Sequence, residues 1–249
     1  MTPLLYLGDT TLSTAASYLG GVLSNAGLRF DYLPSDAALS AQQISAGRPL
    51  VIVSDYPAAR ISTAVQERIV SAVADGMGLL MIGGWESFHG LGGDWDGTPI
   101  GRILPVEISA SDDRLNCDHP VLIRCVAPAH DITEGLPWET RPPVIGGMNK
   151  VVAKPLGSVL LEACHYAADW YRGELRLHAA GRDPLLVVGT HGAGRVACLM
   201  TDAAPHWVGP FVDWGATRVS AKVPGAGEIE VGSLYAQFFQ QLVRWTMGK

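Results

Sequence analysis

The chain of 249 residues carries a formal net charge of −6, and 48% of its residues are hydrophobic while 17% are charged. This composition is typical of a globular protein and excludes a largely disordered chain. The charges are spread without basic blocks, which argues against binding to nucleic acid or to an anionic membrane. We therefore expect the ligand to be a small molecule or a protein partner.

The sequence also bears on compartment and domain number. The segment Met1 to Asp9 lacks the basic region of a signal peptide, and no apolar run is long enough to span a membrane. We expect a single domain over residues 1–249. The absence of a CxxC pair favours reduced thiols and a cytoplasmic location; the cysteines are Cys117, Cys125, Cys164 and Cys198.

The first third of the chain alternates strand and helix patterns. Short apolar runs predict four strands, at residues 4–7, 28–33, 49–53 and 78–82. Apolar residues at helical spacing predict two helices, at residues 12–23 and 63–74. This alternation implies right-handed crossovers and an open parallel sheet with helices on both faces.

Beyond residue 100, turns rather than helices separate the apolar segments. These segments predict antiparallel additions to the sheet, at residues 103–108, 158–163, 185–189 and 196–201. The turn from His191 to Gly194 predicts a hairpin between the last two. The Gly- and Pro-rich segment 141–147 predicts a surface loop, and the apolar stripe at 234–245 predicts a helix that packs back on the sheet.

The segment GLLMIGGWESFHG at residues 78–90 ends its apolar run on Gly83 and Gly84. Ligands of doubly wound sheets bind beyond the carboxyl ends of the strands, so three loops should converge there, at residues 8–11, 54–57 and 83–90. A tight bend from strand to helix can hold one side chain exposed for chemistry. The alternative is that the glycines only end a strand, with Trp85 and Phe88 in the core.

Three short motifs, together with the order of the elements, resemble a known family. The motifs are IGGWESF at 82–88, DITEGL at 131–136 and TDAAPHW at 201–207. They resemble the glutamine amidotransferase-like family, a divergent branch of the class I glutamine amidotransferase fold. DITEGL is similar to the "HPITxGL" segment of related domains, with Asp131 after His130 where His-Pro is usual, and TDAAPHW is similar to a "D…HW" segment at a strand end.

The resemblance covers essentially the whole chain and implies the fold class. We expect an α/β protein with an open, mainly parallel sheet of flavodoxin-like or class I amidotransferase-like type. Helices should cover both faces, and the C-terminal half should add antiparallel strands.

The sequence departs from the family's chemistry at the glycine bend. Class I amidotransferases carry a Cys at a G-x-C-x-G elbow and a downstream H-x-E triplet, because a thiolate attacks the glutamine amide while His moves the proton. Here the elbow falls near Gly83 to Trp85, where there is no cysteine, and no H-x-E triplet occurs. We predict that glutaminase activity by this mechanism is absent and that the former crevice binds a small molecule or a partner. The residues expected to line it are Asp55, Gly83, Gly84, Trp85, Glu86, Ser87, His89, Asp202, His206 and Trp207.

Two other interpretations remain open. A hydrolase would use Ser87 or Glu86 with His206 as base, oriented by Asp202 or Asp55. The spacing around Ser87 is not G-x-S-x-G, and a serine that caps a helix after the bend is the simpler interpretation. In the other interpretation the chain is a structural subunit, and its loops form the interface of a homo-oligomer.

Metal and cofactor sites have little support in the sequence. A metal would need His89, Asp202 and His206 together, or the pairs around Cys117 to His119 and Cys164-His165. None of these sets has the spacing of a recognised zinc motif. We therefore predict no metal and no cofactor.

Overall fold

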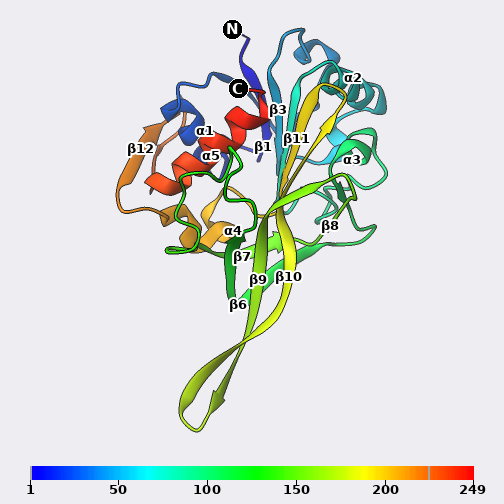
Figure 1. Ribbon diagram of the computed structural model, residues 1–249. Coiled ribbons are helices and arrows are strands. Elements are labelled where there is room, and N and C mark those ends of the chain that lie inside the picture. Colours follow the sequence, from blue (N-terminus) through cyan, green and yellow to red (C-terminus); the bar gives the residue numbers. More distant parts are fainter. Residues whose placement is uncertain (1, 224) are drawn as a thin grey trace.

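The structure is a computed structural model that describes residues 2–223 and 225–249. Its main element is a nine-stranded mixed sheet with the strand order β2-β1-β3-β4-β11-β10-β9-β6-β7. Helices surround the parallel half, and the antiparallel half extends away from them (Figure 1). The predicted α/β class, with antiparallel additions in the second half of the chain, is confirmed.

Five parallel strands form the first half of the sheet. Four are the strands predicted from the apolar runs, and the fifth pairs in parallel with the fourth through Cys198 and Met81. Burial on both faces explains why the inner strands at residues 50–53 and 78–82 are continuous aliphatic runs, whereas the edge strand at 30–34 is only partly buried. Their bounds are β1 (Leu4–Gly8), β2 (Phe30–Pro34), β3 (Leu50–Ser54), β4 (Gly78–Ile82) and β11 (Gly194–Leu199).

Helices cover both faces of the parallel half, as predicted. α1 (Ala16–Asn25) and α5 (Ser233–Thr246) lie together on one side, and α2 (Thr63–Ala74) lies on the other (Figure 1). α5 buries the centre of its apolar stripe, Phe238 and Leu242, fully, and the ends of the stripe, Leu234 and Trp245, partly. The main difference from the predicted bounds is that α1 begins at Ala16 rather than near residue 12.

The antiparallel half consists of long strands joined by turns. The predicted hairpin at His191 to Gly194 is confirmed, since those two residues pair across β10 and β11. The strands are β6 (Arg114–Cys125), β7 (Val144–Asn149), β9 (Ser158–Tyr171) and β10 (Glu174–His191). The smaller elements are η1 (Ala41–Gln43), η2 (Ala58–Arg60), α3 (Pro99–Ile103), β5 (Val106–Glu107), β8 (Val152–Ala153), α4 (Pro205–Val208), η3 (Gly209–Asp213), β12 (Arg218–Lys222) and β13 (Glu228–Gly232).

Two local predictions were wrong. The segment 103–108 holds the end of α3 and only a two-residue strand, because Pro99 and the Thr98 cap start a helical turn there. The expected loop at 141–147 becomes β7 from Val144 onward. Its glycines have a packing reason, since a Cβ on Gly147 would lie 2.6 Å from the Trp207 ring.

The glycine bend also differs from expectation. Residues 85–97 form turns rather than a helix, so Ser87 caps none. Phe88 is buried in the core, whereas Trp85 is 47% exposed. The alternative that places both Trp85 and Phe88 in the core is therefore correct for Phe88 and wrong for Trp85.

β9 and β10 are much longer than the strands predicted at 158–163 and 185–189, and they form a hairpin, not predicted from the sequence, that projects from the body of the protein (Figure 1). Its outer part, residues 167–182, is exposed on both strands. Within the described residues, no helix has the length and apolar character that crossing a membrane requires.

A tight contact joins the start of β4 to the end of α5. A Cβ on Gly78 would lie 2.2 Å from the backbone oxygen of Thr246. We expect Gly78→Ala to push the helix outward and to lower the free energy of unfolding by about 1–3 kcal/mol, measured by urea denaturation. Gly227→Ala is the matched control, because nothing lies within 4 Å of its Cβ position. Equal urea midpoints for the two variants would contradict this packing.

Candidate functional site

The carboxyl ends of β3 and β11 bring three chemically active side chains together. Asp55 directly follows β3, Asp202 follows β11, and His206 lies in α4. One ligand atom from each of these side chains lies within 4.8 Å of the others. The site therefore stands at the edge of the sheet where ligands of this fold class bind.

Asp55 is held in an unusual backbone conformation. Its φ of 53° lies in the left-handed region, which is uncommon and costly for residues other than glycine. Its N–H donates to Ser87 Oγ over 2.9 Å, and its Oδ1 accepts from the Glu86 N–H over 2.9 Å. A Cβ on Gly84 would lie 2.1 Å from the same oxygen, so only glycine lets the carboxylate approach the bend.

Burial and a second carboxylate change the acidity of Asp55. Burial is the main cause that raises its pKa to about 8, and the nearby Asp202 raises it further. The Glu86 N–H and His206 act in the opposite direction but do not offset these effects. Two carboxylates at such short range do not both ionise readily unless a proton or a cation stands between them.

Asp202 and His206 form an oriented pair. Asp202 Oδ1 accepts from the N–H groups of Ala203 and Ala204 over 2.5 and 3.1 Å, which fixes the carboxylate. Its Oδ2 lies 3.0 Å from Nε2 of His206, whose side chain is 52% exposed. The contact with Asp202 is the main cause that raises the pKa of His206. The imidazole is thus held by a buried acid and remains open to solvent.

Glu86 adds a further acidic group from the glycine bend. Burial raises its pKa, and the negative charge of Asp9, just beyond β1, raises it further. A hydrogen bond with Ser35 and the charge of Arg60 lower it. The loops after β1, β3 and β4 therefore act on one another electrostatically, as the predicted convergence requires.

Asn149, at the end of β7, fixes the glycine bend. Its side chain is fully buried, and its Oδ1 accepts from the Gly84 N–H over 2.9 Å. Its Nδ2 donates to the backbone oxygens of Gly84 and Ser87 over 3.2 and 3.4 Å, and to Asp113 Oδ1 over 2.8 Å. One amide therefore binds the bend at two points and connects it to the chain before β6.

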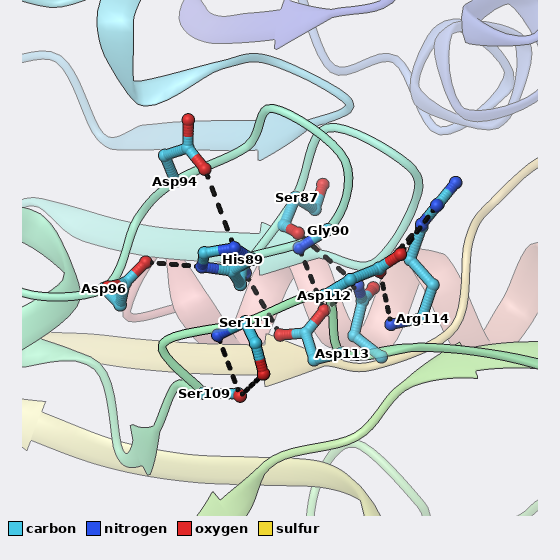
Figure 2. A network of polar contacts seen from close by, with 11 residues as sticks. Ser87, His89, Gly90, Asp94, Asp96, Ser109, Ser111, Asp112, Asp113 and Arg114 are labelled. Carbon is cyan, nitrogen blue, oxygen red and sulfur yellow. Dashed lines mark hydrogen bonds and ion pairs between the residues drawn. The ribbon is translucent and has the colours of Figure 1, made fainter.

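Asp113 holds the next part of the same loop. Its two oxygens accept from the N–H groups of His89 and Gly90, each over 3.0 Å (Figure 2). Sequence reasoning missed both Asp113 and Asn149. A buried acceptor and a buried amide have no spacing that distinguishes them from surface residues, so no pattern in the sequence was available to find them.

The other predicted crevice residues lie apart from this acidic group. His89 contacts Asp96 over 2.7 Å and Asp94 over 3.8 Å (Figure 2). Trp207 is buried and donates from Nε1 to Asn116 Oδ1 over 2.9 Å. Trp85 is half-exposed, with the guanidinium of Arg114 4.5 Å from its ring centroid.

Two of the predicted residues support the bend rather than face a ligand. Ser87 is fully buried, and its hydroxyl accepts the Asp55 N–H. Gly83 leaves room for Met200, because a Cβ there would lie 2.2 Å from the Met200 backbone oxygen. A concavity of about 680 Å³ lies elsewhere, beside the edge strand β2 and the end of β12, and the acidic group does not line it.

Comparisons with known proteins place this geometry in context. A family model described as "Putative glutamine amidotransferase" matches residues 43–222. Among curated proteins, none matches the sequence.

Among solved structures, two cytoplasmic proteins of Salmonella typhimurium share the fold over 98% of this chain and 99% of their own. STM3548 is 23% identical with a TM-score of 0.75, and STM1381 is 24% identical with a TM-score of 0.71. A ThuA-like protein from Bacteroides uniformis is 12% identical with a TM-score of 0.52, over 98% of this chain and 92% of its own. At these identities the likeness is one of fold.

The role of Asn149 is testable by removing its amide. We expect Asn149→Ala to lower the free energy of unfolding by about 1–3 kcal/mol, because it leaves buried backbone groups of the bend without partners. Amide hydrogen exchange at Gly84 should accelerate as well. Asn25→Ala is the control, since that side chain makes an exposed contact with Gln240. Unchanged exchange at Gly84 in Asn149→Ala would show that the bend holds without this amide.

Proposed function

The chain belongs to the "Putative glutamine amidotransferase" family, as its motifs predicted, and from that premise we propose that it binds a small polar molecule without glutaminase chemistry. The ligand would lie in the crevice at the carboxyl ends of β3, β4 and β11. Glu86, Asp202 and His206 would provide its polar contacts. We also propose a cytoplasmic location, with support from the two Salmonella proteins of this fold that are described as cytoplasmic.

The positions of the thiols support the loss of glutaminase chemistry. A nucleophilic cysteine needs a lowered pKa and access to its substrate. Cys198 is fully buried inside β11, and Cys117, Cys125 and Cys164 lie on β6 and β9. Burial raises the pKa of all four thiols. None stands at the glycine bend.

The observation that carries the proposal is the position of the partly buried Asp55 beside the buried Asp202. Withdrawing two neighbouring carboxyl groups from water opposes folding unless cations or hydrogen bonds compensate. Among the described residues, the basic side chain beside Asp202 is His206, which is half-exposed. Strained acidic groups at a strand end are typical of binding and catalytic sites.

A hydrolase is the second candidate in the same crevice, and the pair of Asp202 and His206 favours it. An imidazole oriented by a buried carboxylate is the arrangement of a general base. The burial of Ser87 disfavours a serine nucleophile, so His206 or Glu86 would instead activate a water molecule.

A thermal-shift screen tests the binding proposal. The full chain is heated with glutamine, other amino acids and sugars in a buffer that contains a chelator. A ligand at a hundred times its dissociation constant should stabilise the wild type by about 2.7 kcal/mol. Glu86→Gln and His206→Ala should lose the shift, and glutamine should release no ammonia.

The matched controls for this screen are Glu139→Gln and His178→Ala, whose side chains are exposed away from the crevice. Both should retain the shift. No shift of the wild type with any compound, or an equal shift in Glu86→Gln and His206→Ala, would rule out a binding crevice of this composition.

A role as a subunit of a homo-oligomer is favoured by the projecting hairpin. Its cross-strand pairs Trp170–Leu175 and Ala168–Leu177 place apolar residues on one side. We call this side the apolar hairpin face; it consists of Tyr166, Ala168, Trp170, Leu175, Leu177 and Ala179. An isolated two-stranded ribbon is marginally stable in water, and Trp170 is 75% exposed.

A second copy of the chain would cover this face best, because the same apolar face of two copies can pack together about a two-fold axis. The other side of the hairpin is polar, with Asp169 3.2 Å from His178 and Arg176 over the Tyr171 ring. Only one side of the hairpin therefore suits such a contact.

Light scattering after size-exclusion chromatography tests this interface. We expect a dimer for the wild type at micromolar concentration and a monomer for the double variant Trp170→Ser, Leu177→Ser. Arg176→Ser, on the polar side, should stay dimeric. A monomeric wild type, or a dimeric double variant, would exclude the apolar hairpin face as the dimer contact.

A further inference from the structure

We propose that Asp55, Asp202 and His206 bind one divalent transition-metal cation, of the Zn²⁺ or Mn²⁺ class. The inference rests on the proposed function, because the metal ion would lie in the same crevice. The sequence suggested a different metal site, in which Asp202 and His206 would be joined by His89. In the structure the third group is Asp55, which follows β3 and lies 147 positions before Asp202 in the chain.

The separations of the donor atoms fit one coordination sphere. With metal bonds of about 2.1 Å, adjacent ligand atoms lie about 3.0 Å apart at a right angle and about 3.4 Å apart at a tetrahedral angle. Asp202 Oδ2 and His206 Nε2 are 3.0 Å apart, and all three donor atoms lie within 4.8 Å of one another. The proposal requires Asp55 or the half-exposed imidazole to move toward the other donors when the ion binds.

A buried oxygen without a partner is the second observation. The side chain of Asp202 is only 4% exposed, yet its Oδ2 accepts no hydrogen bond from the residues that the structure describes. The imidazole nitrogen beside it is close but is not directed at it as a hydrogen-bond donor would be. Two ligands of one metal ion have this relation, because both lone pairs point to the ion rather than to each other.

The anchoring of the carboxylates leaves one oxygen of each available. Asp202 uses Oδ1 for the N–H groups of Ala203 and Ala204, and Asp55 uses Oδ1 for the N–H group of Glu86. Backbone donors that orient a carboxylate in this way are typical of the groups around metal ligands. The second oxygen of each acid therefore remains for the ion.

The negative charge around Asp55 also favours a bound cation. Asp9 and Asp202 place negative charge near Asp55, and His206 is the positive group that acts on it. A divalent ion would offset the charge of the two neighbouring carboxylates.

The donor set favours a transition metal over magnesium or calcium. Mg²⁺ and Ca²⁺ take oxygen ligands, whereas an imidazole nitrogen with carboxylates suits Zn²⁺ and Mn²⁺. Three protein ligands leave a position open for water or for an oxygen of the organic ligand.

A second His–Asp pair in the same protein provides a matched control. His165 Nε2 lies 3.0 Å from Asp183 Oδ2, the same separation as in the proposed site. Here, however, Lys150 Nζ lies 3.7 Å from Asp183 Oδ1, and among the described residues no second carboxylate joins the pair as Asp55 does in the proposed site. This pair should bind no metal.

The experiment measures the metal alone on the full chain, stripped with chelator and then dialysed against Zn²⁺ or Mn²⁺. We expect one equivalent bound to the wild type and, by calorimetry, a dissociation constant at least about tenfold weaker in Asp202→Asn and His206→Gln. Asp183→Asn should bind like the wild type. Because His206 is half-exposed, His206→Gln tests the site even where Asp202→Asn fails to fold. No uptake by the wild type, or unchanged affinity in both variants, overturns the proposal.

The metal test and the ligand screen can contradict their two hypotheses separately. The screen is run in chelator, so a metabolite shift without metal uptake supports the binding function and overturns the metal site. Metal uptake that His206→Gln weakens, without any metabolite shift, supports the metal site and counts against the small-molecule function.

Discussion

The hydrogen bonds of one buried amide connect the two halves of this protein at its functional edge. Asn149 ends β7 in the antiparallel half, and its backbone N–H donates to the Met200 oxygen beyond β11. Its side chain then binds both backbone groups of Gly84 at the end of β4. The positions of Glu86 and Ser87 depend on this anchor, and through their bonds to Asp55 the buried carboxylate depends on it as well.

Much of the parallel half was predictable because its physics is local. A strand buried on both faces must be a continuous aliphatic run, and the segments 50–53 and 78–82 have this pattern. The spatial arrangement of these helices and strands then follows from short connections and right-handed crossovers. The place of the crevice, at the ends of β3 and β4, was predictable for the same reason. Asp55 was predicted because it follows a strand end directly, and Asp202 and His206 because the segment 201–207 resembles a motif of the family.

The antiparallel half was less predictable because its sequence signals are not local. β6 begins with charged and polar residues, including Arg114 and Asp118, and continues as an apolar run, so no single pattern marks the whole strand. The glycines of β7 are typical of a loop, and only the packing of Trp207 on Gly147 explains them. Asn149 and Asp113 act on a bend that lies far away in the chain, and no spacing rule encodes such a contact.

The contrast between local and non-local signals also explains why the chemistry of the site is harder to predict from the sequence than its position. The sheet fixes where strand ends meet, whatever residues follow them. Which groups meet there depends on side-chain orientation, and here Asp55, Asp202 and His206 come together. Asp55 binds a proton in the folded chain that it would release in the unfolded chain, because its pKa rises from 3.8 to about 8. By linkage, this group alone makes the fold less stable as the pH rises through that interval. An arrangement that opposes folding at neutral pH is therefore better explained by what it binds than by what it stabilises.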